Sequence, residues 1–279
     1  MKKIIAAFDG LKFSESTLSY ALDIASISDC SLAGVFLDDF TYHSYKIYDM
    51  IGSQGVDAEK LRQLTEKDAE TRKQSVLRFE EECQRKGINY LVHHDKSIAL
   101  QELLNESIYS DLLIISAHET LTHFEEDIPT RFIKNLLIDV QCPVLIVPKA
   151  YKKIENVIVL YDGDPSSVYA VKMFSYMLAG LKVLPIKVVT VKSDEELPAF
   201  PKQHLIIEFI KCHFPSVKFK SIEGKPENEI INYLTHQQKN SIVILGAYRR
   251  NMVSRWFKPS MADALMKNTN LPLFVAHYK

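Results

Sequence analysis

The chain has 279 residues, of which 47% are hydrophobic and 25% are charged, so it can bury sizeable cores and has about the length of two ordinary domains. Its formal net charge of −1 at pH 7 provides no basic field for nucleic acid and no reason to expect a membrane surface as the main partner. The apolar run before Asp9 is too short for a signal-peptide core, and no run is long enough to span a membrane, so we expect a cytoplasmic protein.

In the first half of the chain, predicted strands alternate with predicted helices. The strands are expected at 2–9, 31–38, 88–94, 111–116 and 143–148, and the helices at 14–27, 57–86, 97–107 and 130–140. Alternation with crossover-length connections is typical of a parallel, doubly wound sheet. The long polar helix carries Val76, Phe79 and Cys83 on one face, so it should cover one face of this sheet.

The second half repeats the start of the first half. Residues 3–10 read KIIAAFDG and residues 156–163 read NVIVLYDG, and each run ends in an aromatic residue, aspartate and glycine. A serine follows the aspartate at the same distance in both copies, as Ser14 and Ser167, and a helical stretch follows each serine. Two matches of this length indicate a duplicated unit.

A later element is repeated as well. The loops at 116–130 and 246–260 have equal length, each ends in a proline followed by a hydroxyl residue, and each leads through a helix to a proline-led apolar strand. The chain is therefore predicted to be a tandem duplication with domains at 1–150 and 151–279, joined by a polar connector at 148–156.

These corners, loops and closing strands make the chain resemble the universal stress protein family over essentially its whole length, as two concatenated copies. The resemblance implies an α/β fold with two tandem doubly wound parallel five-stranded sheets in the order 3-2-1-4-5, related by a pseudo-twofold axis at which the strands 143–148 and 272–277 meet. It also implies a stress-response or signalling role. In nucleotide-binding members the loop after the fourth strand has the pattern G-x2-G-x9-G-S/T and wraps ATP phosphates, because glycine lets backbone N–H groups approach the anion.

The second copy keeps part of that pattern. It has Gly246 and Ser260, but Arg249 and Pro259 stand where glycines belong. The basic side chains of this loop could bind phosphate where glycine amides are missing, and the alternative is a solvated basic loop. The candidate cofactor-binding residues are Asp162, Gly163, Gly246, Arg249, Arg250, Lys258 and Ser260. We expect either no cofactor or one ATP with Mg²⁺ at this copy.

The first copy keeps only the hydroxyl residue, Thr130, and has Ser116, Glu119 and Pro129 at the glycine positions. Its loop contains four acidic residues and no Lys or Arg, so a polyphosphate would meet like charge, and we expect no nucleotide there. The loop at 246–260 has four basic residues and no acid. Opposite charges predict that the two loops pair, within one chain or between chains, and the alternative is that both are solvated.

Other residues are interpreted as structural. Asp162 and Asp164 are weak candidates for metal ligands, and a turn is the alternative, so no metal site is predicted. His93 and His94 are adjacent in a strand and should point to opposite faces of the sheet.

Neither the serines nor the cysteines are predicted to be reactive. Ser14 and Ser167 should cap helices rather than act as nucleophiles. The cysteines are widely spaced and are interpreted as reduced core thiols: Cys30, Cys83, Cys142 and Cys212.

No catalytic residues are predicted, because the common enzyme signatures are missing from the sequence. The favoured hypothesis is a nucleotide-independent module that acts by binding protein partners or by self-association, without nucleic acid or membrane. The alternatives are an adenine-nucleotide sensor that uses the second copy only and, third, a weak ATP hydrolase.

Overall fold

The computed structural model describes residues 1–37, 44–45, 51–52, 55–56, 58–95, 98–122, 124–192, 200–237, 240–246 and 261–276. The elements of the first copy are β1 (Lys3–Asp9), α1 (Glu15–Ser28), β2 (Ser31–Leu37), β3 (Ile51–Gly52), β4 (Gly55–Val56), α2 (Ala58–Arg85), β5 (Tyr90–Asp95), α3 (Ala99–Ile108), β6 (Leu112–Ser116), α4 (Arg131–Asp139) and β7 (Val144–Val147). The elements of the second copy are β8 (Asn156–Leu160), α5 (Pro165–Met177), the 3-10 helix η2 (Ala179–Val183), β9 (Ile186–Lys192), α6 (Gln203–His213), β10 (Val217–Glu223), α7 (Pro226–Gln237), β11 (Ser241–Gly246), α8 (Met261–Asn268) and β12 (Leu273–Ala276).

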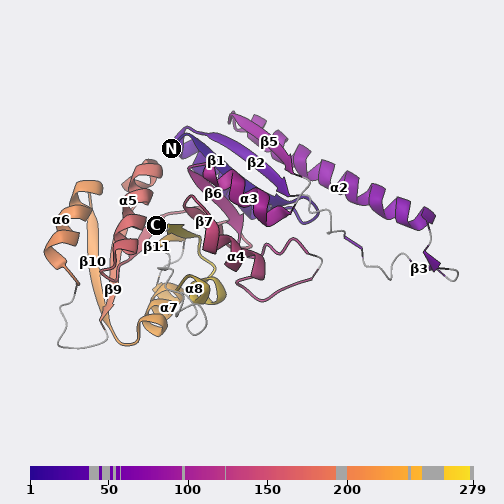
Figure 1. The fold of residues 1–279 in the computed structure, drawn as a ribbon. Coiled ribbons are helices and arrows are strands. Elements are labelled where there is room, and N and C mark those ends of the chain that lie inside the picture. The colour runs from indigo at the N-terminus through magenta and orange to yellow at the C-terminus, as the bar shows by residue number, and fades with distance from the viewer. Residues whose placement is uncertain are drawn as a thin grey trace.

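Ten of the strands form one sheet in the order β10-β9-β8-β11-β12-β7-β6-β1-β2-β5 (Figure 1). Within each copy the pairs are parallel and the strand order is 3-2-1-4-5, which confirms the predicted fold class. The two five-stranded halves are continuous, because β7 pairs with β12 in the antiparallel direction. The predicted meeting of the two closing strands is therefore confirmed.

The seam between the copies is apolar. Phe274 lies opposite Leu145, and both side chains are fully buried. The Phe274 ring also makes an edge contact with Phe174 of α5, with 5.5 Å between ring centroids. Sheet edges are usually paired or covered, so each closing strand satisfies the edge of the other copy.

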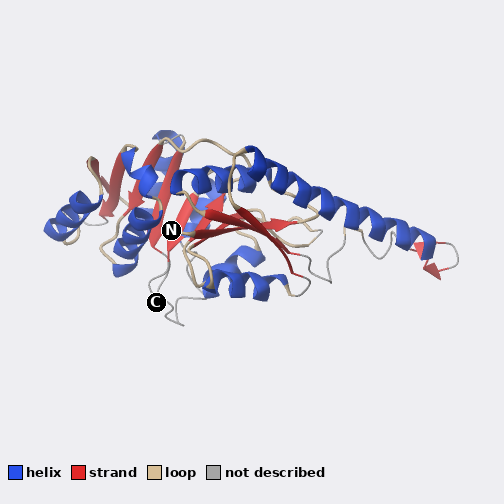
Figure 2. Cartoon of the chain, turned by 90° about the horizontal axis from the view of Figure 1, so that it is seen from above, coloured by secondary structure: helices blue, strands red, loops and turns tan. Residues whose placement is uncertain are grey.

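Helices cover both faces of the sheet (Figure 2). Alternate residues of each strand point to opposite faces, so Ile4, Ala6 and Phe8 of β1 join one core cluster while Ile5 and Ala7 join the other. The first cluster contains residues of α1, α2, α5 and α6, and the second contains residues of α3, α4, α7 and α8. Strands buried on both faces explain the continuous apolar runs in the sequence.

The helix α2 is only partly packed against the sheet. Phe79 and Cys83 are fully buried, as predicted for the helix face that covers the sheet. The N-terminal half of α2 extends beyond the sheet, and the short strands β3 and β4, which form an antiparallel pair, lie near its far end (Figure 1). The sequence did not predict this pair. Within the described residues, none of the helices is both long enough and apolar enough to cross a membrane.

The connector between the copies is packed against α1. Tyr151 donates a hydrogen bond to the carboxylate of Asp23, its ring lies 4.8 Å from that of Tyr20, and the Lys152 N–H donates to the Tyr20 hydroxyl at 3.2 Å. The predicted domain boundary at residue 150 falls in this connector. The copies are thus held together by side-chain contacts as well as by the shared sheet.

Candidate functional site

The predicted nucleotide site of the second copy begins at the corner after β8. The Asp162 carboxylate accepts a hydrogen bond from the Asp164 N–H at 3.0 Å, and Gly163 has a φ of 85°, so the residues form a tight turn of the Asx type. Asp162 and Asp164 are both exposed. This turn directs the chain into the first turn of α5.

Gly246 lies beside the same turn. It ends β11, and a Cβ atom at this position would lie 2.4 Å from the Ser166 carbonyl carbon and 2.6 Å from the Ser167 nitrogen. The structure therefore brings Gly246 to the N-terminal turn of α5, next to the corner at Asp162. The close approach gives this glycine a packing role that does not depend on any ligand.

The geometry of the site can be described for only some of its predicted residues. Arg249, Arg250, Lys258 and Ser260 lie outside the described residues. Their proposed contacts with phosphate stay predictions.

The corresponding corner of the first copy has a different environment. Asp9 ends β1 and is buried, with 1% of its surface exposed, and its carboxylate accepts a hydrogen bond from the Leu11 N–H at 2.8 Å. The turn is thus the same as at Asp162, but this aspartate is enclosed. It is enclosed in part by the loop after β6.

Glu119 of that loop is also buried, with 6% of its surface exposed. One oxygen of its carboxylate accepts hydrogen bonds from the Thr120 N–H at 3.0 Å and from the Leu121 N–H at 3.1 Å. Leu121 has a φ of 50°, a left-handed conformation that costs about 1–2 kcal/mol for a residue with a Cβ atom. Successive N–H groups that converge in this way form a concave site for an anion, and here the anion is the loop's own carboxylate.

The charge balance around Glu119 is unfavourable to its ionised form. Burial, together with the negative charge of Asp9, raises the pKa of Glu119 to about 7, although the N–H groups of Leu121 and Thr120 and the ammonium of Lys12 act in the opposite direction. Of the four acidic residues in the loop, Glu119 faces inward, and Glu125, Glu126 and Asp127 are exposed.

Hydrogen bonds within the loop also satisfy polar groups at its end, where α4 begins. Thr130 is the N-cap of α4, where its hydroxyl oxygen accepts the Ile133 N–H at 3.2 Å and its O–H donates to the Glu119 carbonyl. The Arg131 N–H donates to the Glu126 carboxylate at 2.7 Å. Two N-terminal amides of α4, those of Arg131 and Ile133, thus have partners from the end of the loop.

The two early-helix serines bond to backbone groups. Ser14 is the N-cap of α1, and its hydroxyl oxygen accepts the Thr17 N–H at 3.1 Å, as predicted. Ser167 lies inside α5 instead of at its cap, which is Asp164, and its hydroxyl donates to the Asp164 carbonyl at 2.8 Å.

The histidine pair points to opposite sides of the sheet, as predicted. His93 contacts the Glu106 carboxylate of α3, whereas the His94 ring stacks on Phe36 in the other core cluster, with 5.8 Å between centroids. Among the residues that the structure describes, no three His, Cys, Asp or Glu side chains lie close enough together to hold a metal ion.

The cysteines differ from the prediction in one respect. Cys83 and Cys142 are buried, Cys30 is half-buried, and none of the four forms a disulfide. Cys212 is exposed on α6 and is therefore not a core thiol. Burial raises the pKa of Cys83 to about 12 and the pKa values of Cys30 and Cys142 to about 11, which makes these three thiols unreactive at neutral pH.

Comparisons with known proteins agree with the duplicated architecture. The curated universal stress protein Slr1230 of Synechocystis sp. is 22% identical over 291 aligned positions, which cover 98% of this chain and 99% of the relative. The crystal structure of a universal stress protein from Archaeoglobus fulgidus is similar with a TM-score of 0.72 and 14% identity, over 99% of this chain and 98% of that one. A functionally unknown protein from Pseudomonas aeruginosa is similar with a TM-score of 0.58 and 14% identity, over 99% and 92% of the two chains. No protein-family model matches the chain.

Proposed function

We propose that the chain is a tandem universal stress protein, a stress-response module of the cytoplasm that acts by binding or protein interaction and performs no catalysis. In this proposal the first copy binds no nucleotide. The observation that carries it is the buried carboxylate of Glu119, which accepts the N–H groups of Thr120 and Leu121. A phosphate at these amides would have to displace a group that is covalently part of the loop.

Electrostatics support the same conclusion. Asp9 and Glu119 are buried together, and the exposed part of the loop carries Glu125, Glu126 and Asp127. A polyphosphate would therefore approach negative charge at the surface and again inside the loop. Each contribution disfavours the anion that the family pattern would bind.

The exposed acids provide the surface for interaction. Strands β7 and β12 are antiparallel, and each is parallel to the fourth strand of its own copy, β6 or β11. The carboxyl ends of β6 and β11 therefore point in opposite directions, and the two loops begin on opposite sides of the sheet. This arrangement favours pairing of the acidic loop with a basic surface of another chain over pairing within one chain. Exposed ion pairs contribute only about 0–1 kcal/mol each, but complementary charge sets orientation and the rate of association.

Charge reversal tests the interaction. Glu125 and Asp127 are suitable positions, because the Glu126 carboxylate is already bonded to the backbone of α4. We expect Glu125→Lys with Asp127→Lys to weaken self-association in sedimentation at low salt, and Arg249→Glu with Arg250→Glu in the same chain to restore part of it. Association that is the same in every variant, or that does not respond to salt, would contradict the proposal.

An adenine-nucleotide sensor that uses only the second copy is the alternative function. It is favoured by one observation, the position of Gly246 against the first turn of α5 beside the exposed Asp162. Calorimetric titration with ATP and Mg²⁺ separates the two functions. We expect no site in the first copy, so the titration should give at most one site per chain.

If that single site binds nucleotide, Arg249→Ala or Lys258→Ala should weaken it at least about tenfold, since a charge-assisted contact contributes roughly 1.5–3 kcal/mol. Lys153→Ala, at an exposed residue of the connector, is the control and should bind as the wild type does. Two equivalent sites per chain would show that the loop of the first copy does bind nucleotide.

A further inference from the structure

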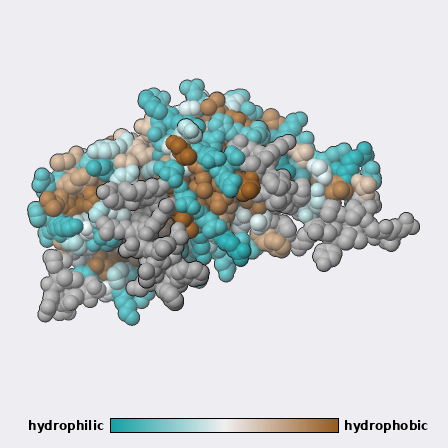
Figure 3. Space-filling model, viewed as in Figure 1, coloured by the Kyte–Doolittle hydropathy of each residue, from teal (hydrophilic) through white to brown (hydrophobic). Residues whose placement is uncertain are grey.

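A groove lies between α5 and α6, and Gly163 of the corner after β8 lines one end of it. It has a cavity volume of about 630 Å³, within the range of small-molecule sites, and lies on the face of the sheet covered by α1, α2, α5 and α6. Figure 3 shows apolar residues among hydrophilic ones over α5 and α6. The neighbouring faces of the two helices line it: Pro165, Val168, Tyr169 and Lys172 from α5, and Leu205, Ile206, Phe209 and Cys212 from α6.

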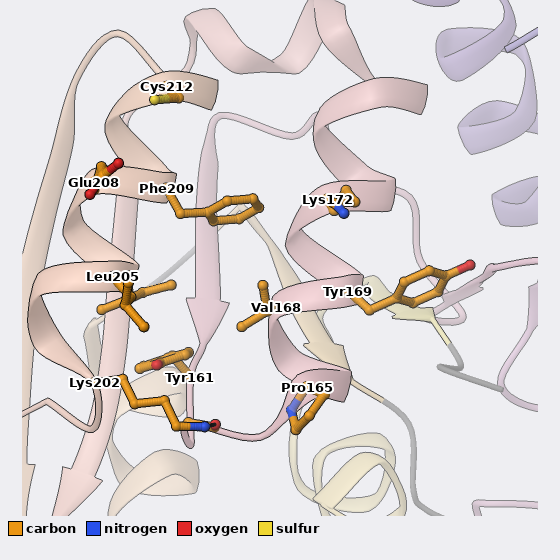
Figure 4. Close-up of a pocket in the computed structure, with 12 residues that line it drawn as sticks. Tyr161, Pro165, Val168, Tyr169, Lys172, Lys202, Leu205, Glu208, Phe209 and Cys212 are labelled. Atoms are coloured by element: carbon orange, nitrogen blue, oxygen red, sulfur yellow. Dashed lines mark hydrogen bonds between the residues drawn. The ribbon is translucent and has the colours of Figure 1, made fainter.

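The walls of the groove are mainly apolar. Phe209 extends from α6 toward α5, and Val168 lies on the facing side (Figure 4). Leu205 is 54% exposed, so its side chain is accessible to a ligand in the groove. The α5 residues that line the groove span two helical turns, about 10 Å at 1.5 Å per residue. The groove is thus long enough for an extended apolar ligand.

The charged groups of the groove favour an anion. Lys172 of α5 and Lys202, the N-cap residue of α6, line it, and Glu208 is the acidic residue among its lining residues. Lys202 donates to the Gly163 carbonyl at 3.2 Å and keeps further N–H donors. Among the residues that the structure describes, Lys172 has no carboxylate within ion-pair distance. The pKa of His213 is lowered by burial first, and then by the positive charges of Lys182 and Lys172.

The first copy provides an internal comparison, because the same space there is closed by protein. Glu15 occupies the position that corresponds to Val168, and it forms an ion pair with Arg78 of α2 at 3.2 Å. The Gly10 carbonyl, which corresponds to that of Gly163, accepts a buried hydrogen bond from Ser75 of α2 at 2.8 Å. In the second copy Val168 stands in place of Glu15, and Lys202 is the donor to the glycine carbonyl, so these two contacts do not close the groove.

We propose that the groove between α5 and α6 binds a small amphipathic carboxylate, an acyl chain with one anionic end. The acyl chain lies against Val168, Leu205 and Phe209, and the carboxylate is bound by Lys172. No described residue of the loops at 116–130 and 246–260 lines the site, which shares only Gly163 with the predicted nucleotide residues that the structure describes. It therefore stands or falls apart from the proposed function.

Decanoate is a suitable probe, and Cys212 is a built-in reporter. Cys212 is the exposed thiol of the four and lines the groove, whereas burial makes the other three slow to react. We expect decanoate, below its micelle concentration, to bind once per chain in calorimetry and to slow the alkylation of Cys212 by iodoacetamide in a saturable manner. Lack of saturable binding, or unchanged alkylation of Cys212 at saturation, would overturn the proposal.

Leu205→Glu tests the apolar wall, with Leu91→Glu as the matched control. Both leucines are about half exposed, at 54% and 52%, but Leu91 lies on β5 in the other copy. The glutamate introduced by Leu205→Glu should weaken decanoate binding by about tenfold or more, because its carboxylate would lose water on contact with the acyl chain and would repel the anionic end of decanoate. Leu91→Glu should bind normally. Equal affinities of the two variants would show that decanoate binds elsewhere.

Lys172→Gln tests the anionic end and, at an exposed residue, should not affect folding. It should weaken decanoate by about tenfold, the loss expected for a charge-assisted contact, and leave decanol unchanged. Decyltrimethylammonium, with the same chain and the opposite charge, should bind more weakly than decanoate to the wild type. If it binds equally well, the charge assignment is wrong.

Discussion

Replacement of Glu119 by glutamine should make the protein more stable at alkaline pH. The side chain is buried, and its pKa in the folded protein is about 7 compared with an ordinary value of 4.5, because of burial and the nearby charge of Asp9. Between these two pH values the folded state binds more protons than the unfolded state. The free energy of unfolding therefore falls as pH rises through this window.

The magnitude follows from the two pKa values. A difference of about 2.5 between them corresponds to about 3 kcal/mol, at 1.36 kcal/mol for each pH unit. Glutamine keeps an oxygen that can accept the Thr120 and Leu121 N–H groups but does not ionise. We expect the wild type and Glu119→Gln to have similar stability near pH 4, and the variant to be about 3 kcal/mol more stable near pH 8.

Urea unfolding at a series of pH values measures this effect. Glu125→Gln, at an exposed acid of the same loop, is the control and should follow the wild type. Asp9→Asn keeps the acceptor for the Leu11 N–H and removes the charge beside Glu119, so it should reduce the pH dependence. A stability difference between Glu119→Gln and the wild type that is the same at all pH values would refute the assignment of a buried, destabilised carboxylate.

Three further substitutions test the packing of the fold by denaturant unfolding. Gly246→Ala should destabilise the protein by about 1–3 kcal/mol whether or not nucleotide is present, since its Cβ would lie 2.4 Å from the Ser166 carbonyl carbon, and full stability would disprove that contact. Phe274→Ala, at the seam between the copies, should cost about 3–5 kcal/mol, and a loss below about 1 kcal/mol would argue against a packed seam. Ser75→Ala should cost about 1–3 kcal/mol because it leaves the buried Gly10 carbonyl without its hydroxyl donor, and an unchanged midpoint would argue against that bond.

The fold could be predicted from the sequence because the same signals occur twice. Apolar runs buried on both faces, glycine after aspartate at the first corners and proline before the closing strands all reflect local requirements of a doubly wound sheet. The packing of Tyr151 on α1 was missed, because a polar connector has no periodic pattern that reveals a tertiary contact.

The candidate site was predicted less well, for physical reasons. Glu119 stands in an acidic, polar stretch that is typical of a solvated loop, and its raised pKa depends on burial and on the charge of Asp9, which lies far away in the sequence. Gly246 fits a phosphate loop and a close contact with α5 equally, and the sequence does not distinguish these two uses of glycine. The groove between α5 and α6 could not be found at all, because it arises from the spacing of two helices.

Because both copies lie in one chain, β7 of the first copy always pairs with β12 of the second, and never with another β7 in the same molecule. Two separate chains of one kind would pair as identical subunits, and separate chains of two kinds would mix according to their concentrations. Here a short connector holds unlike copies together, so their pairing does not depend on protein concentration. Each molecule therefore carries one enclosed aspartate corner at Asp9 and one exposed corner at Asp162. A substitution at either corner changes that corner in every molecule and leaves the other corner as it was.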